Sequence, residues 1–266
     1  MVYRRRMIVM PSETACTNEI KIHALLNRLQ DTAGLAVADT EGAPVELMRR
    51  GYGWVLLKYG LEVLTRLPGM DEPLVIETRH TAGDGFHTLR VFRVFREADE
   101  AETLVVAKTS WVLIDLAAGR PVRATQRLPG VFSRVDGDDP IDEEFAEIPR
   151  FSGARLKDEP VLTEAVFPVR FHDLDANGHV NNAVYFEWAW EATPLDPLGW
   201  SVREMHAEFR VSVKLGETAL VRVKTLPAEG GIRSFAYDIV EKNGDPARPL
   251  ARFSSVWAPL SEPKGP

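Results

Sequence analysis

Three polar side chains that can do chemistry alternate along one short stretch of the second half of the chain: Asp175, Asn177 and His179. A carboxylate can act as a base or a nucleophile, an amide can orient it, and an imidazole can transfer a proton near neutral pH. The surrounding segment, DLDANGHVNN (173–182), also opens like the calcium loop of an EF-hand. Two kinds of site must therefore be told apart, an acid–base site and a metal site.

The residues in and around this segment argue against a calcium site. An EF-hand loop needs a bidentate glutamate at its twelfth position and a helix on either side. Counted from Asp173, that position holds Val184, and residues 166–171 read VFPVRF, an apolar, β-branched run that favours a strand. The carboxylates and histidines of the loop also match no familiar zinc spacing. The sequence therefore predicts no metal and no cofactor.

The loop leads into a helix that we expect to begin near Asn181 or Asn182. The first turn of a helix presents unpaired N–H groups and the positive end of the helix dipole, so a carbonyl placed there would have its developing oxyanion stabilised. A nearby carboxylate could activate water or attack the carbonyl directly. We therefore expect hydrolysis of an activated acyl group, with Asn181 and Asn182 at the oxyanion site or as helix caps.

The elements that must position this loop occur in the same order in both halves of the chain. The first half predicts a helix over 20–34 and the second half a shorter helix over 181–194, and each is followed by strand-like runs. The apolar face of the first helix comprises Ile22, Leu25, Leu26, Leu29 and Ala33. The predicted strands lie at about 54–64, 74–81, 87–96, 103–115, 203–213, 218–226, 232–241 and 250–258.

The polar constellation is confined to the second repeat. The corresponding part of the first, RRRMIVMPSETACTNE, lacks it. If such side chains were needed only to turn a strand into a helix, both repeats would require something similar. The asymmetry therefore favours a chemical role for Asp175, Asn177 and His179, whereas Asp173 is expected to cap the loop or the helix.

A helix followed by long strands is the order of an antiparallel sheet wrapped around one helix. Such a sheet leaves an edge exposed, and a fused repeat supplies a partner for that edge within the chain. We predict an α+β tandem of two antiparallel sheets joined edge to edge, each wrapped on a central helix. The predicted domains are residues 1–132 and 161–266, and 133–160, rich in Asp, Glu, Pro and Gly, is the predicted linker.

Composition limits the partners and the compartment. The net charge of −7 argues against nucleic acid as the main partner, because phosphate binding needs concentrated Lys and Arg. The single cysteine, Cys16, excludes an intrachain disulfide and suits a reducing compartment, so we expect a cytoplasmic protein. The apolar run after the basic start ends at Pro11, and no stretch approaches the ~20 apolar residues that cross a bilayer. We expect neither an export segment nor a membrane partner.

The segment DLDANGHVNNAVYFEWAWEATP (173–194) closely resembles the active-site segment of the plant-type and bacterial acyl-acyl carrier protein thioesterases, which are fused double-hotdog enzymes. The resemblance extends along most of the chain, through LLNRLQDTA, LPGMDEPLVIET, TSWVLID and EFRVSVKLGET. It implies hydrolysis of fatty acyl-acyl carrier protein to free fatty acid and the carrier thiol. It also implies that the first repeat, including the strand with Trp54 and Leu56, lines the acyl pocket, and that the second repeat is catalytic.

By position, the catalytic Asp, Asn and His of that family fall on Asp175, Asn177 and His179. Its Glu, and the Cys or Val that follows, fall on Ser212 and Val213, so this chain departs from the family at the Glu and cannot use a Cys nucleophile there. The expected roles are Asp175 as general base or nucleophile, Asn177 as its orienter, and His179 as the group that stabilises charge or protonates the leaving thiolate. Ser212 could hydrogen-bond a water.

Two other functions stay open. GHVNN alone is also similar to single-hotdog acyl-CoA thioesterases of the 4-hydroxybenzoyl-CoA type, so acyl-CoA is an alternative substrate. A non-catalytic hotdog protein that binds acyl chains is the other, favoured by the missing Glu and disfavoured by the retained Asp, Asn and His. Acyl chain length and homodimerisation stay undetermined.

The aromatic group of the second helix is predicted to be core: Tyr185, Phe186, Trp188 and Trp190.

Overall fold

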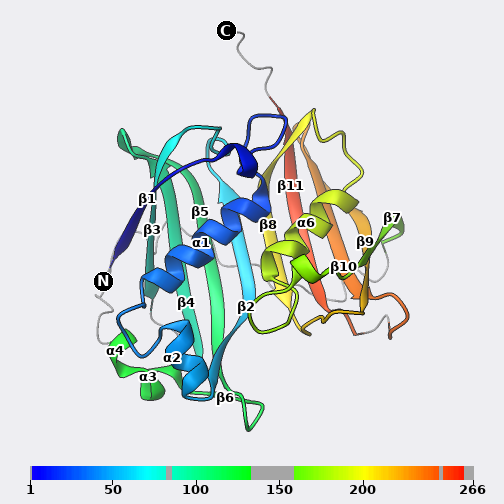
Figure 1. Cartoon of the computed structure of the whole chain (residues 1–266). Coiled ribbons are helices and arrows are strands. Elements are labelled where there is room, and N and C mark those ends of the chain that lie inside the picture. Colours follow the sequence, from blue (N-terminus) through cyan, green and yellow to red (C-terminus); the bar gives the residue numbers. More distant parts are fainter. Residues whose placement is uncertain (1, 82–85, 133–158, 246–247, 261–266) are drawn as a thin grey trace. The chain divides into compact units, whose positions relative to one another are not determined.

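The computed structural model describes residues 2–81, 86–132, 159–245 and 248–260. The chain divides into two units, Met1–Ile148 and Pro149–Pro266, and in each of them one long helix lies across antiparallel strands (Figure 1). Of the predicted linker, residues 133–158 lie outside the described residues. No helix of the described part is both long enough and apolar enough to span a membrane.

The first unit orders its strands β1-β3-β4-β5-β2, all in antiparallel pairs, and β6 adds to β5. The helix α1 crosses this sheet (Figure 1). The elements are β1 (Tyr3–Ile8), the 3-10 turn η1 (Pro11–Glu13), α1 (Ile22–Leu35), α2 (Pro44–Arg49), β2 (Tyr52–Val63), β3 (Pro73–Thr81), β4 (His87–Arg96), β5 (Asp99–Asp115), β6 (Arg120–Val122), α3 (Ala124–Arg127) and α4 (Pro129–Phe132).

The second unit has the equivalent order β7-β9-β10-β11-β8, again antiparallel throughout, with α6 across it (Figure 1). Its elements are β7 (Val161–Pro168), the 3-10 turn η3 (Phe171–Asp173), α6 (Asn182–Ala192), β8 (Trp200–Phe209), β9 (Thr218–Leu226), β10 (Arg233–Glu241) and β11 (Ala251–Pro259). Apart from α2, β6, α3 and α4, which occur only in the first unit, both units have the same order of elements. The repeat predicted from the sequence is therefore confirmed, as is the α+β class.

The predicted strand over 203–213 is wrong at its carboxyl end. β8 runs from Trp200 to Phe209, and residues 210–213 belong to the connection to β9. The N–H groups of Arg210 and Val211 both donate to the Leu250 carbonyl, at 2.9 and 3.1 Å. Two successive donors on one acceptor break the alternation of a β-ladder, so the chain leaves the sheet at this point.

Hydrophobic periodicity predicts the buried face of α1 with one error. Ile22, Leu25, Leu26 and Leu29 are all buried, but Ala33 is only half-buried. Thr32 is buried in its place, because its hydroxyl donates to the Arg28 carbonyl at 2.7 Å and so needs no outside partner. The first helix is thereby fixed on its sheet by leucine and isoleucine side chains.

Aromatic side chains fix α6 on the second sheet. Tyr185, Phe186 and Trp188 are each no more than 2% exposed, which confirms them as core. The half-buried Trp190 packs edge-on against Trp257, with ring centroids 4.5 Å apart. Large rings on several sides of one helix hold its amino-terminal end, and the loop before it, in a fixed position.

Candidate active site

Asp175, Asn177 and His179 lie on a tight hairpin between η3 and α6. The Gly178 N–H donates to the Asp175 carbonyl (3.0 Å), and the Asp175 N–H donates to the His179 carbonyl (2.7 Å). Gly178 has a φ of 74°, and a residue in this left-handed conformation commonly ends a short hairpin loop. The hairpin sets Asp175 and His179 opposite each other.

The conformation of Gly178 can be tested by substitution. Gly178→Val is expected to lower the free energy of unfolding by about 1–3 kcal/mol, because a β-branched residue resists positive φ. No atom lies within 4 Å of a Cβ built there, so the cost comes from the backbone alone. Gly178→Asn should cost much less, since Asn18 holds the same place in the first unit with a φ of 65°. Urea unfolding of both variants checks this, and equal losses would contradict it.

The Asp175 carboxylate is held by its own turn. Its Oδ1 accepts hydrogen bonds from the backbone N–H groups of Asn177 (2.8 Å) and His179 (3.1 Å), and its Oδ2 lies 3.4 Å from Asn177 Nδ2. The side chain is half-buried, and these bonds leave acceptor capacity on both oxygens. The carboxylate is thus oriented by the loop and still able to accept a proton.

The first unit builds the same loop without this carboxylate. The Ala15 N–H donates to the Glu19 carbonyl at 2.8 Å and the Asn18 N–H to the Ala15 carbonyl at 3.0 Å, which repeats the bonds of the second unit. Ala15 stands where the second unit has Asp175, and Glu19 where it has His179. A turn-forming role therefore does not account for Asp175.

Asp173, in contrast, is structural. Its side chain is 2% exposed, and it accepts hydrogen bonds from the Arg170 backbone N–H and from Arg170 Nη2, both at 2.7 Å. Its counterpart Glu13 accepts from the Met10 N–H at 3.0 Å. Both units thus close the 3-10 turn before the loop with a carboxylate, and the prediction that Asp173 caps the loop is confirmed.

The two capping carboxylates should behave alike on substitution. Asp173→Ala and Glu13→Ala are each expected to lower the free energy of unfolding by about 1–2 kcal/mol, because a backbone N–H loses its acceptor. The ion pair with Arg170 adds little, since that guanidinium is 63% exposed. Equilibrium denaturation measures both effects. A variant of Asp173 that is fully stable and yet inactive would contradict a purely structural role.

The two asparagines at the start of α6 differ in what they can offer a substrate. Asn181 is the N-cap: its Oδ1 accepts from the Ala183 N–H at 2.9 Å, and its own N–H donates to the Asp173 carbonyl at 2.8 Å. Within the part of the chain that the structure describes, the Asn182 N–H has no acceptor. Of the two oxyanion candidates, the Asn182 N–H is therefore the free donor at the positive end of the helix.

Ser212 lies beside the loop and not on the long strand where the sequence placed it. It is exposed, three residues after β8 ends at Phe209, and the next residue, Val213, is fully buried. The Val213 carbonyl accepts from the Val180 N–H at 2.8 Å, which ties this connection to the loop of Asp175 and His179. The departure from the family pattern at Ser212 therefore falls next to the site.

Tyr185 is linked to the site in a way that its prediction as a core residue missed. It is 2% exposed, and its hydroxyl forms a hydrogen bond with the backbone of Val213. Burial raises the pKa of the Tyr185 hydroxyl well above its usual value, and the charges of Glu217 and Asp175 raise it further. The hydroxyl therefore stays protonated within electrostatic range of Asp175. The sequence signal was its spacing of one helical turn from Asn182.

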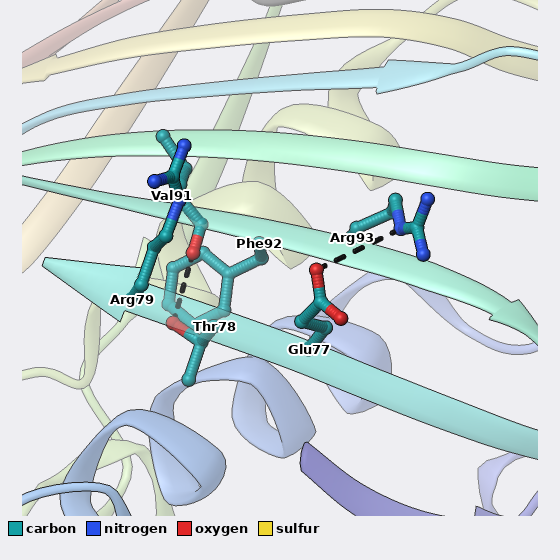
Figure 2. Close-up of a pocket in the computed structure, with 6 residues that line it drawn as sticks. All are labelled: Glu77, Thr78, Arg79, Val91, Phe92 and Arg93. Carbon is teal, nitrogen blue, oxygen red and sulfur yellow. Dashed lines mark hydrogen bonds and ion pairs between the residues drawn. The ribbon is translucent and has the colours of Figure 1, made fainter. Parts of the chain in front are cut away.

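Other candidate places carry none of the predicted chemistry. Among the described residues, no group of three or more His, Cys, Asp or Glu side chains is arranged to hold a metal. A shallow hollow, open to solvent, lies at β3 and β4 of the first unit (Figure 2). It is lined by Glu77, Thr78, Arg79, Val91, Phe92 and Arg93. There Glu77 Oε1 lies 3.9 Å from Arg93 Nε, and the Thr78 hydroxyl donates to the Val91 carbonyl at 2.9 Å. These polar groups therefore link the neighbouring strands β3 and β4.

Solved structures share the fold. An oleoyl thioesterase (putative) from Lactobacillus plantarum superposes with a TM-score of 0.84 at 21% identity, covering 98% of each chain. The 12:0-ACP thioesterase from Umbellularia californica superposes with a TM-score of 0.79 at 19% identity, covering 97% of each chain. At these identities the likeness establishes the fold alone.

Sequence comparisons cover most of the chain. A chloroplastic acyl-[acyl-carrier-protein] hydrolase of Cuphea viscosissima is 26% identical over 211 residues, which is 74% of this chain and 48% of that protein. A chloroplastic palmitoyl-acyl carrier protein thioesterase of Arabidopsis thaliana is 24% identical over 204 residues, 73% of this chain and 48% of that protein. The chain thus spans about half the length of these curated relatives.

Family models match both units in order along the chain. Residues 1–128 match the acyl-ACP thioesterase N-terminal domain, and residues 156–253 match the acyl-ACP thioesterase C-terminal domain. Together with the repeat, the loop of Asp175 and the free N–H at the start of α6, these matches lead to one conclusion: the chain belongs to the acyl-ACP thioesterase family.

Proposed function

We propose that this chain hydrolyses fatty acyl-acyl carrier protein to a free fatty acid and the carrier thiol. Family membership supports the reaction and the substrate class. The observation that carries the proposal is the Asp175 carboxylate, which sits on a turn that the first unit forms with Ala15 in the same place. A carboxylate that the fold does not require, on the loop that leads to the Asn182 N–H, is suited to chemistry at a carbonyl.

In the proposed mechanism, Asp175 takes a proton from a water molecule whose oxygen attacks the thioester carbonyl carbon. The carbonyl oxygen becomes an oxyanion and accepts a hydrogen bond from the Asn182 N–H at the positive end of α6. The intermediate then collapses, the C–S bond breaks, and His179 donates a proton to the leaving thiolate. Direct attack by Asp175 would instead give a mixed anhydride, which water hydrolyses in a second step. Asn177, against the carboxylate, orients it for either route.

The departure at Ser212 weakens neither route. Its hydroxyl can hold a water as donor or acceptor, and its backbone neighbour Val213 is bonded to the loop. A hydroxyl positions water by hydrogen bonding without adding a second negative charge beside Asp175. We therefore assign Ser212 to water positioning.

We also infer that the two sheets form a double hotdog, joined edge to edge. Within the first unit's own order β2 is a terminal strand, and within the second unit's order β8 is. A long terminal strand with unpaired backbone groups is an aggregation hazard unless it is covered. Pairing these edges with each other satisfies both. The same inference gives the predicted domains, 1–132 and 161–266, one hotdog each.

The first unit is the proposed acyl-chain pocket. Leu56 on β2 is 3% exposed, and Trp54 packs against an apolar cluster that the short helices help to form. The buried members of that cluster are Val37, Leu47, Leu113, Ala124, Leu128 and Val131. Apolar side chains of this kind are suited to line a fatty acyl chain. The exposed free thiol of Cys16 suits the reducing cytoplasm, which we propose as the compartment.

The substrate class is tested by hydrolysis of one acyl group presented on two carriers. Purified protein is expected to release thiol from the acyl carrier protein thioester with a kcat/KM at least about tenfold above that for acyl-CoA. A clear preference for CoA would overturn the carrier assignment and leave an acyl-CoA thioesterase. Binding of acyl groups with no turnover on either thioester would show a non-catalytic acyl-binding protein.

A further inference from the structure

Lys214 lies in line with Asp175 and His179. The hairpin sets Asp175 opposite His179, and an antiparallel bridge sets His179 opposite Lys214. Side chains of directly opposed residues share one face, with Cβ atoms about 4.5–5.5 Å apart. The next residues along, Val180 and Val213, are 4% and 0% exposed and so point to the interior. The three polar side chains therefore form a row on the outer face of the loop.

Among the described residues, Lys214 is also a cation beside this loop whose ammonium has no partner, and the nearby Glu217 carboxylate accepts from its backbone N–H at 2.9 Å. Arg170 is paired with Asp173 at 2.7 Å and Arg210 with Glu208 at 3.0 Å. The Lys214 side chain is exposed, and among the residues that the structure describes its ammonium has no ionic or hydrogen-bonding partner. A solvated ammonium beside a catalytic row is available to an anionic group of a ligand.

The cation occurs only where the catalytic side chains occur. In the first unit the same row holds Ala15, Glu19 and Gly69, and the bridge between Glu19 and Gly69 repeats the one at Lys214. The backbone pairing is therefore kept in both units, while base, imidazole and ammonium are present in one. Lys214 is not required by the fold at its position.

We propose that Lys214 binds the phosphate of the phosphopantetheine arm that presents the acyl thioester; this inference rests on the proposed function. The arm joins the thioester sulfur at one end to a phosphate at the other. The row runs outward from Asp175, at the reacting carbon, through His179 to Lys214. An ammonium at its outer end meets the arm on its way to the carrier and binds phosphate as a point charge.

Exposed apolar side chains that neighbour the loop and Lys214 along the chain suit the rest of the arm. Phe171, Val211 and Leu215 are 72%, 52% and 56% exposed. Val211 and Leu215 lie on either side of Lys214 in the connection between β8 and β9, and Phe171 begins the turn before the loop. The methylene and methyl groups of a pantetheine arm can cover such side chains while its phosphate pairs with Lys214.

The test compares three thioesters of one acyl group: the acyl carrier protein, CoA, and pantetheine without phosphate. Lys214→Met in the full chain is expected to raise KM about five- to tenfold for the two phosphate-bearing substrates, and to change KM for acyl-pantetheine by less than about twofold. Lys214→Arg should keep most of the affinity. The matched control is Lys242→Met, an exposed lysine after β10, which should leave all three substrates unchanged.

Each other result is decisive. A fall in kcat on all three substrates would mean that Lys214 acts on the reacting atoms, and no change on any would mean that it has no role; either overturns the proposal. A loss with the carrier protein alone would put the contact on the protein surface of the carrier and not on the phosphate. If the unaltered chain hydrolyses none of the thioesters, the proposed function fails instead. Calorimetric binding of free phosphopantetheine to the unaltered chain and to Lys214→Met then still tests Lys214.

Discussion

Asp175→Asn is expected to lower kcat for acyl carrier protein thioesters by about 10²- to 10⁴-fold while the protein stays folded. The amide oxygen of asparagine can still accept from the N–H groups of Asn177 and His179, so the turn keeps its hydrogen bonds. What the variant loses is the ability to take a proton from water or to attack the carbonyl. Steady-state thiol release measures the loss, and thermal unfolding checks that the melting temperature is preserved.

A matched control separates the loss of a base from the loss of any aspartate. Asp196 follows α6 on the surface and accepts from the Leu198 N–H at 3.0 Å, a bond that asparagine can also accept. Asp196→Asn should leave kcat and stability unchanged. Full activity of Asp175→Asn would show that another group acts as the base. A large fall in the melting temperature of Asp175→Asn would show that Asp175 has a structural role.

Local pattern predicts the elements of this chain well because the signals are themselves local. Apolar residues at helical spacing located α1, the preceding loop and the stop at Pro194 located α6, and alternating runs located most strands within one to three residues. The predicted end of β8 was wrong because the strand stops where the Leu250 carbonyl accepts two hydrogen bonds. Leu250 is distant in sequence, so local pattern carries no sign of this. The short helices α2, α3 and α4 were missed for the same reason, since they form against a cluster that is assembled from distant segments.

The candidate site shows the same division between local and distant information. The sequence predicted the group of Asp175, Asn177 and His179 because one hairpin holds all three. It could not predict whether Asn181 or Asn182 offers a free N–H, because that depends on which backbone N–H donates to the Asp173 carbonyl. Lys214 joins the row only through a bridge between segments far apart in the chain, and one sequence carries no signal of that pairing.

His179→Gln is expected to lower kcat for alkyl thioesters by about 10²-fold. His179 is half-buried beside Asp175, and its backbone N–H holds the carboxylate, a bond that the substitution retains. The lost function is proton donation to the leaving thiolate, whose conjugate thiol has a pKa of about 8.5 when it resembles cysteine. A thioester of an aromatic thiol, a much stronger acid, releases a thiolate that needs no proton. The loss in kcat should therefore shrink toward a few-fold on that ester.

The dependence on the leaving group is what distinguishes proton donation from a role in orientation. If His179 only positioned Asp175 or the substrate, His179→Gln would slow both esters equally, because attack on the carbonyl is common to them. His172 supplies the matched control: it is exposed in the preceding turn, with its ring edge-on to Phe171 at 5.6 Å. His172→Gln should leave both esters unaffected, so a selective loss at His179 identifies the imidazole that meets the departing sulfur.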